Sequence, residues 1–199
     1  MPLILESIVT TKAVEGGWHL VPFGLIVEGD DYIVAPFRPS PTIANLEAHP
    51  FLAAAAPCDV RVIAGCVTGR RDWATLPCER VDGVRLAEAY AHVELAVAER
   101  RDDPVRPRFR CRVVHSASHR PFIGYNRAQA AVIEAAILST RLHMLPAEKI
   151  RTEMDYLAIA IAKTAGPAEE EAWGWITDKV RAAGVFEEPE HAEAAARTT

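Results

Sequence analysis

Several short motifs that would assign a function directly are missing from this sequence of 199 residues. There is no P-loop, no G-x-G-x-x-G after a strand-like segment, no H-E-x-x-H and no G-x-S-x-G. Hydrolase and P-loop functions therefore lose their usual sequence support. The four cysteines, at positions 58, 66, 78 and 111, contain no C-x-x-C pair. A disulfide scaffold or a zinc ribbon is disfavoured, and we expect ordinary reduced thiols.

Excess positive charge and long apolar runs are also missing. The formal net charge is -5, which argues against nonspecific nucleic-acid binding, because that binding depends on neutralising phosphates. The N-terminus lacks a basic segment, and Glu6 interrupts its apolar run well before membrane-spanning length. We expect a soluble, cytoplasmic protein. We expect no metal site, because the spacing of His115 and His119 comes without a third ligand placed beside it in the sequence.

The first half of the chain carries strand and turn signals. Segments 3–11, 18–27 and 32–37 are apolar or rich in β-branched residues and are separated by glycine-containing turns, which predicts a three-stranded meander. Segments 51–56, 91–99 and 108–115 are further strand candidates, while 59–66 fits a helix or a strand. Segment 67–86 shows no clear period and is predicted to be loop with short pieces of structure. A sheet of at least five or six strands follows.

The second half changes to a helical period. Asn126 is a favourable N-cap and Gln129 completes a capping-box-like pattern, so a helix should start at Arg127 and continue through the alanine-rich segment 128–145. Two further helices are predicted, one over 146–165 and one that ends at Gly184. Strands followed by helices, without βαβ alternation, indicate an antiparallel barrel or sheet carrying a helical subdomain. The predicted divisions are a domain over 1–120, a helical subdomain over 121–186 and a mobile acidic tail over 187–199.

The alanine-rich helix is predicted to lie at an interface. Arg127, Glu134 and Arg141 recur every seven residues and so share one face, while small residues allow a neighbouring element to approach closely.

An anion site is the strongest local candidate for chemistry. Ser40 at an N-cap and Pro41 at the first helical position fit known preferences, and the free backbone N–H groups beyond them attract anions. Arg38 adds a guanidinium and Thr42 a hydroxyl, so the group could hold a phosphate monoester. A well-capped surface helix beside an arginine explains the same residues equally well.

A second candidate is the segment of Pro22, Phe23 and Gly24. Proline leaves a gap in the strand ladder and glycine lets a ligand approach the backbone, so a flat heterocycle could hydrogen-bond there. A simple β-bulge is the favoured alternative on these residues alone.

Four blocks of the sequence resemble one family. Residues 4–11 (ILESIVTT), 21–27 (VPFGLIV), 36–46 (PFRPSPTIANL) and 122–142 (FIGYNRAQAAVIEAAILSTRL) are similar to the DUF447 family, and the resemblance extends to about residue 185. It implies a mainly β fold, an FMN-binding split β-barrel of the antiparallel, Greek-key type, with a C-terminal three-helix subdomain. The family is related to flavin reductases and pyridoxamine-phosphate oxidases. A homodimer with FMN at the subunit interface is implied as well.

Carried over by position, the resemblance assigns the FMN phosphate to Arg38, Ser40 and Thr42. It places Pro22, Phe23 and Gly24 along the isoalloxazine edge, and it implies that Asn126 and Arg127 close the pocket. In a flavoprotein the flavin performs the redox chemistry while the protein orients it and tunes its potential. An arginine near the N1 side, for which Arg127 is the candidate, stabilises the reduced flavin.

Three functional hypotheses remain at this point. The first is an FMN-dependent oxidoreductase, a flavin reductase that uses NADH or NADPH or an enzyme acting on a small substrate such as a pterin. The second is an FMN carrier or redox partner without turnover of its own. The third is a helical dimerisation module with an empty barrel. No catalytic side chain is assigned in any of them, because fold and cofactor transfer across a family better than reaction does.

Overall fold

The computed structural model describes residues 1–186, and the predicted acidic tail, 187–199, lies outside the described residues. The chain divides into two compact units, residues 1–124 and the residues from Tyr125 onward. Within the described part, none of the helices combines the length and the apolar character needed to cross a membrane.

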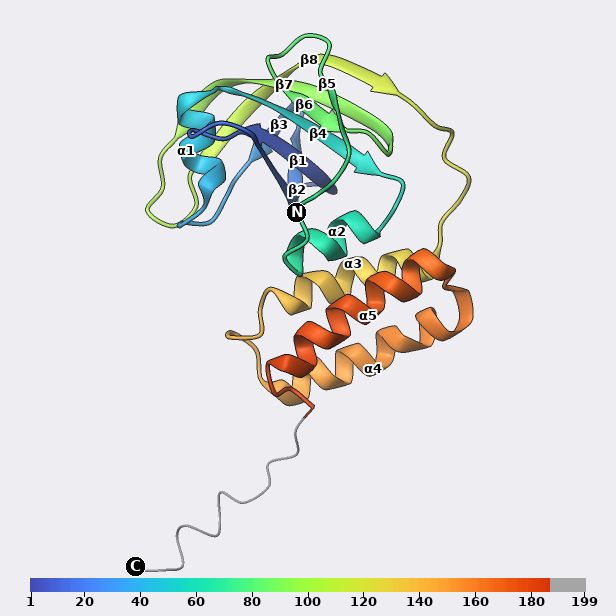
Figure 1. Cartoon of the computed structure of the whole chain (residues 1–199). Helices are drawn as coiled ribbons and strands as arrows, with labels where there is room; N and C mark the ends of the chain where they lie inside the picture. Colours follow the sequence, from blue (N-terminus) through green and yellow to red (C-terminus); the bar gives the residue numbers. More distant parts are fainter. Residues whose placement is uncertain (187–199) are drawn as a thin grey trace, which may run out of the picture. The chain divides into compact units, whose positions relative to one another are not determined.

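Six antiparallel strands of the first unit close into a barrel, in the order β1-β2-β3-β8-β7-β4 (Figure 1). The mainly β fold with a C-terminal helical unit is therefore confirmed, as is the opening meander of three strands. The barrel strands are β1 (Ile4–Lys12), β2 (Trp18–Glu28), β3 (Asp31–Val34), β4 (Phe51–Pro57), β7 (Ala89–Arg101) and β8 (Arg108–Ser118).

The barrel is split because β3 is short. Its four residues pair with the first half of β8, and the second half, 113–118, has β7 as its one strand neighbour in the described sheet. Likewise β2 pairs with β3 only over 26–28, so residues 18–25 keep one free edge. The predicted third strand over 32–37 is wrong at its end, since β3 stops at Val34 before Pro36, whose ring removes a ladder donor. At the split, these edges therefore lack a second strand partner among the described residues.

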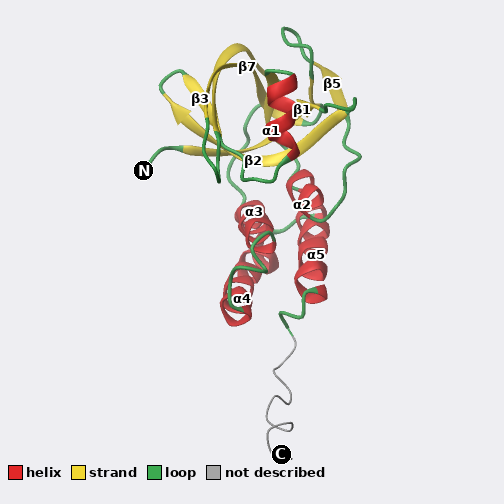
Figure 2. Ribbon diagram, turned by 90° about the vertical axis from the view of Figure 1, so that its left-hand side faces the viewer, coloured by secondary structure: helices red, strands yellow, loops and turns green. Residues whose placement is uncertain are grey.

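The barrel interior is filled by side chains that alternate inward along the strands. One short helix, α1 (Pro41–Ala48), lies across one end of the barrel (Figure 2). Its Ile43 and Leu46 pack among the core residues. The other members of this core are Val9, Leu25, Val34, Leu52, Ala54, Leu95, Phe109 and Cys111. Because α1 is anchored in the core, its N-terminus is held in place at the barrel surface.

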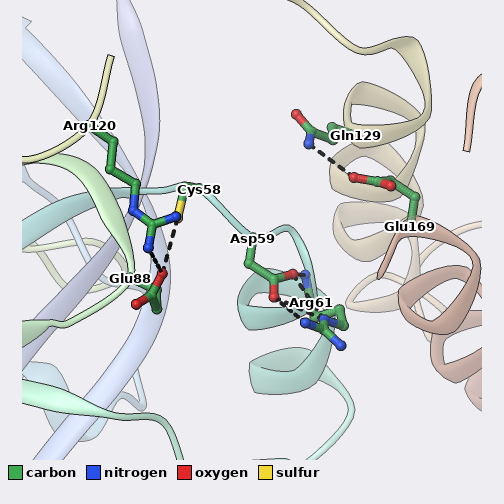
Figure 3. Close-up of polar contacts among 7 residues, drawn as sticks. All are labelled: Cys58, Asp59, Arg61, Glu88, Arg120, Gln129 and Glu169. Carbon is green, nitrogen blue, oxygen red and sulfur yellow. Dashed lines mark hydrogen bonds and ion pairs between the residues drawn. The ribbon is translucent and has the colours of Figure 1, made fainter. Parts of the chain in front are cut away.

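The segment between β4 and β7 holds α2 (Arg61–Val67) and a small hairpin, β5 (Thr75–Pro77) with β6 (Val84–Leu86). The ambiguous segment 59–66 is a helix because Asp59 supports its start: Oδ1 accepts a hydrogen bond from the backbone N of Arg61 at 2.9 Å, and the guanidinium pairs with the same carboxylate (Figure 3). The prediction of loop with short structured pieces over 67–86 is confirmed.

Three helices form the second unit: α3 (Arg127–Ser139), α4 (Ala147–Thr164) and α5 (Pro167–Ala182). The predicted start of α3 is confirmed, since Asn126 Oδ1 accepts hydrogen bonds from the backbone N of Ala128 at 2.7 Å and of Gln129 at 3.2 Å. The predicted capping box is wrong in its second half. The Gln129 side chain instead donates to Glu169 on α5 at 3.0 Å, which links two helices (Figure 3).

The alanine-rich helix α3 packs against both α4 and α5 of its own unit. Its buried residues include Ala131, Ala135 and Ala136, so the predicted close approach is made by these neighbours. The helix ends at Ser139, earlier than the sequence predicts. Thr140 donates its hydroxyl to the carbonyl of Ile137, and such local bonds compete with helix continuation. The residues beyond form a separate turn.

Candidate functional site

The N-terminus of α1 lies where the sequence predicted it. Ser40 is the N-cap in an extended conformation and Pro41 is the first helical residue, but the Ser40 hydroxyl makes no capping hydrogen bond. Pro41 has no N–H, and the N–H of Ile43 donates to the Ser40 carbonyl at 3.1 Å. Of the first three helical residues, Thr42 therefore keeps an N–H that an oxyanion could accept from.

Arg38 stands beside this helix end and is partly exposed. Its guanidinium donates to Asp102 Oδ1 at 2.9 Å and to the carbonyl of Asp103 at 3.3 Å. The Asp103 carboxylate in turn accepts backbone N–H bonds from Val105 and Arg106. The bond from Arg106, and to a lesser extent the bond from Val105, holds the pKa of Asp103 below its usual value. The turn between β7 and β8 thus orients the arginine.

Thr42 differs from Arg38 and Ser40 in being fully buried. Its Oγ1 has no hydrogen-bond partner among the described residues. A buried hydroxyl without a partner is costly. It becomes available to an anion only if the first turn of α1 moves. Arg38 and Ser40 are therefore accessible at the surface, whereas Thr42 is buried.

The segment of Pro22, Phe23 and Gly24 lies on β2, where the pairing with β1 is continuous. The alternative of a β-bulge is therefore wrong. Phe23 packs against the barrel core, so its neighbours on either side face outward. A Cβ on Gly24 would lie 2.7 Å from Ile4 Cγ2, so the packing of β1 against β2 already requires glycine here. On its other side this segment presents the free edge of β2.

A cavity of about 290 Å³ opens into the split of the barrel. Most of the lining side chains are small or apolar, and the polar ones are Ser7, Tyr32, His92, Ser116 and Ser118. The ends of β4 and β8 that line it lie away from α1 (Figure 1). The cavity and the Arg38 site therefore occupy opposite ends of the barrel. No sequence pattern predicted this space, because it depends on which strand ends meet.

Asn126 and Arg127 belong to the helical unit. Both ends of the Asn126 side chain are engaged there: the oxygen caps α3, and the amide donates to the carbonyl of Thr164 at 3.1 Å. Arg127 is exposed. The structure thus gives Asn126 a helix-capping role and leaves the Arg127 guanidinium open to solvent.

The thiols are poor candidates for nucleophiles. Burial raises the pKa of Cys66 to about 11, and that of Cys111 to about 12. Cys58 donates to Glu88 Oε2 at 3.8 Å, and that carboxylate is also paired with Arg120 at 2.6 Å (Figure 3). No disulfide joins cysteines of the described chain. The expectation of ordinary reduced thiols is consistent with these environments.

A buried polar cluster on the outer face of β7 was not predicted. His92 and Glu94 are 3 % and 0 % exposed. Burial alone would raise the pKa of Glu94, but the backbone N–H groups of Glu79, Arg80 and Val81 outweigh it and hold that pKa below its usual value. Burial lowers the pKa of His92. The cluster links the barrel wall to the loop between β5 and β6.

Family models cover most of the chain. The model of the N-terminal domain of a protein family of unknown function, DUF447, matches residues 5–120, and a second DUF447 model matches residues 126–178. The chain belongs to the DUF447 family. No curated protein matches it.

Solved structures share the fold of this DUF447 chain. An FMN-bound DUF447 protein from Methanosarcina mazei is 20 % identical, with a TM-score of 0.77 over 90 % of this chain and 96 % of the other. Flavoredoxin from Methanosarcina acetivorans has a TM-score of 0.50 at 14 % identity, over 62 % of this chain and 75 % of the other. Nitrilotriacetate monooxygenase component B from Bacillus cereus has a TM-score of 0.50 at 15 % identity, over 59 % of this chain and 70 % of the other. At these identities the likeness establishes the split-barrel fold.

Proposed function

We propose that this DUF447 protein is an FMN-binding flavoprotein whose phosphate site is formed by Arg38, Ser40 and the first turn of α1. The observation that carries the proposal is the helix N-terminus without a side-chain cap next to a partly exposed guanidinium. A phosphate dianion gains most where a guanidinium fork converges with other hydrogen-bond donors, here the Thr42 N–H and the Ser40 hydroxyl.

The residues present fit such a phosphate. The ion pair of Arg38 with Asp102 is solvent-exposed, with 39 % and 71 % of the two side chains accessible. Exposed pairs contribute about 0–1 kcal/mol, so a phosphate can compete for the guanidinium. The unpartnered hydroxyl of Thr42 supplies a further donor if the first turn shifts on binding. The relative from Methanosarcina mazei, an FMN-bound member of the same family, supports the same cofactor.

The proposed reaction is an NAD(P)H-linked reduction of a flavin or of a small substrate such as a pterin. FMN, when bound, would supply the hydride chemistry. The chain's own residues would bind and orient: the free edge of β2 at Pro22, Phe23 and Gly24 offers backbone groups to the ring edge, and Arg127 offers positive charge. The cavity in the split has room for a small ligand. No thiol is required as a nucleophile.

The proposed assembly is a homodimer with the flavin at the subunit interface, to which Asn126 and Arg127 contribute. Mass measurement of the flavin-loaded protein in solution, by light scattering after gel filtration, tests it. A monomer that retains the flavin would refute an interface site.

The first experiment is the visible spectrum of the freshly purified protein, followed by release and identification of the chromophore. Arg38→Ala is expected to weaken FMN binding about 10- to 100-fold, because a charge-assisted phosphate contact is lost. It should leave riboflavin binding unchanged, since riboflavin has no phosphate. Arg101→Ala is the matched control, because Arg101 is an exposed arginine paired with Glu99. Equal losses for FMN and riboflavin would contradict the phosphate assignment.

Anaerobic mixing with NADH and with NADPH distinguishes the enzyme from an FMN carrier. Bleaching of the flavin absorbance by either nucleotide is expected. A bound flavin that neither nucleotide reduces would favour the carrier, and a colourless protein that takes up no FMN would refute both.

A further inference from the structure

The polar cluster on the outer wall of the barrel brings together three potential metal ligands, two histidines and one glutamate, from two strands. His92 and Glu94 are two residues apart on β7 and so face the same side. His115 is the cross-strand partner of Glu94 on β8. His119, just beyond β8, stacks on His92 with ring centroids 5.0 Å apart. In the sequence, no third metal ligand lies beside His115 and His119. The sheet register brings two further candidates, His92 and Glu94, next to them.

The donor atoms are already close to one another. His92 Nε2 lies 3.3 Å from Glu94 Oε1, and one donor atom from each of His92, Glu94 and His115 lies within 4.8 Å of the others. A tetrahedral zinc site with bonds of about 2.0–2.1 Å separates its donors by about 3.3 Å. Small side-chain rotations would therefore bring the three onto one cation.

The surroundings hold these ligands in place, as outer-shell bonds do in metal sites. Glu94 accepts backbone N–H bonds from Glu79 at 2.6 Å, Arg80 at 2.7 Å and Val81 at 2.9 Å. The other ring nitrogen of His92, Nδ1, lies 2.9 Å from His119 Nε2. If a metal occupied Nε2, Nδ1 would carry the ring proton and donate a hydrogen bond to Nε2 of His119. The tautomer of His92 thus reports on occupancy.

A purely structural role explains only part of the cluster. The polar atoms of Glu94 and His92 all have hydrogen-bond partners, and through Glu94 they anchor the loop between β5 and β6. His115 differs: its Nε2 is buried and makes no hydrogen bond, although Glu79 Oε1 lies 3.4 Å away. An imidazole nitrogen that makes no hydrogen bond and lies near two carboxylates is suited to binding a cation. Arg85 is a nearby positive charge that would oppose a bound cation. Its charge adds to burial in lowering the pKa of His92.

The geometry points to a binding site for a divalent transition-metal cation, best matched by Zn²⁺, with His92, Glu94 and His115 as ligands and Glu79 as the next nearest donor. Two imidazoles and a carboxylate are the donor set that zinc accepts while keeping a fourth position open. The site would fasten the loop between β5 and β6 to the barrel. It does not depend on the proposed flavin.

The test titrates Zn²⁺ into the full-length protein after treatment with EDTA and dialysis. One equivalent is expected to bind, and His115→Ala should weaken that binding at least about 100-fold, since it removes a direct ligand and outer-shell changes alone cost 10- to 100-fold. His143→Ala is the matched control, because His143 is an exposed histidine outside the cluster. His115→Gln, which keeps a side chain of similar length, replaces the alanine variant if that one does not fold.

Two spectroscopic readouts identify the ligands. Co²⁺ in place of Zn²⁺ should give visible bands without a thiolate charge-transfer band, and nitrogen NMR should show His92 changing tautomer on binding. The proposal is overturned if wild type and His115→Ala bind Zn²⁺ equally, if the thiolate band appears, or if His92 keeps its tautomer.

Discussion

Glu94 offers the sharpest test of how the outer wall of the barrel is built. We predict that Glu94→Gln destabilises the barrel by about 3 kcal/mol and frees the loop between β5 and β6. The carboxylate is fully buried. Its Oε1 accepts from the backbone N of Glu79, and its Oε2 from those of Arg80 and Val81. Every one of these N–H groups needs an acceptor once water is excluded.

The magnitude follows from these bonds. An amide keeps one acceptor oxygen, so two N–H donors can retain a neutral bond while the third faces the new NH₂ group. Bonds to a charged group contribute about 1.5–3 kcal/mol and neutral ones about 0.5–1.5 kcal/mol, so one loss and two weakenings of about 1–1.5 kcal/mol each sum to about 3.5–6 kcal/mol. The relieved cost of burying a charge reduces this to about 3 kcal/mol. That corresponds to a fall in Tm of about 6–12 °C.

The assay is urea unfolding in EDTA, so that no metal contributes, together with hydrogen exchange at the amides of residues 79, 80 and 81. Glu88→Gln is the matched control: Glu88 is 57 % exposed and pairs with Arg120. That substitution should cost less than about 1 kcal/mol. If Glu94→Gln costs no more than the control, or leaves those amides protected, the carboxylate is not what holds the loop.

Three further predictions concern the helical unit and the Arg38 site. Asn126→Ala should cost about 1–2 kcal/mol in urea unfolding through loss of the α3 cap, whereas Asn126→Asp, which keeps the acceptor, should cost less; equal losses would contradict the capping role. Arg127→Ala should lower the flavin reduction potential by about 30 mV, the two-electron equivalent of about 1.4 kcal/mol, with little effect on FMN affinity; a redox titration without a shift would rule out the electronic role. The pKa of Asp103 is lowered in the folded state, so its contribution to stability is complete above the unfolded value of 3.8 and is lost as pH falls through the folded value. Asp103→Asn should therefore flatten the acid limb of the stability curve, and an unchanged limb would refute this.

Local signals in the sequence predicted what local physics controls. The start of α3 follows from one side chain, Asn126, which satisfies the first N–H groups of the helix. The meander of the first three strands follows from alternation and glycine turns. The placement of Ser40 and Pro41 at the start of α1 follows in the same way. Each of these features depends on residues within a few positions of one another.

Features that depend on distant partners were predicted poorly. Gln129 has the spacing of a capping box, but Glu169, forty residues along the chain, offers it a better-placed acceptor. A bulge at Pro22 was the favoured alternative, but β1 pairs with β2 without interruption. Segment 59–66 was ambiguous because a short apolar run fits either period.

The sequence by itself indicated the family, the barrel strands and the three C-terminal helices in their order, and Arg38 with Ser40 as an anion-site candidate, because these rest on composition and near-neighbour chemistry. Only the tertiary structure decided that Thr42 is buried. It likewise decided that the barrel is split beside β8 and that His92, Glu94 and His115 meet on its outer wall. The physical reason is strand register: a shift of one residue would turn Glu94 into the core and separate it from His115.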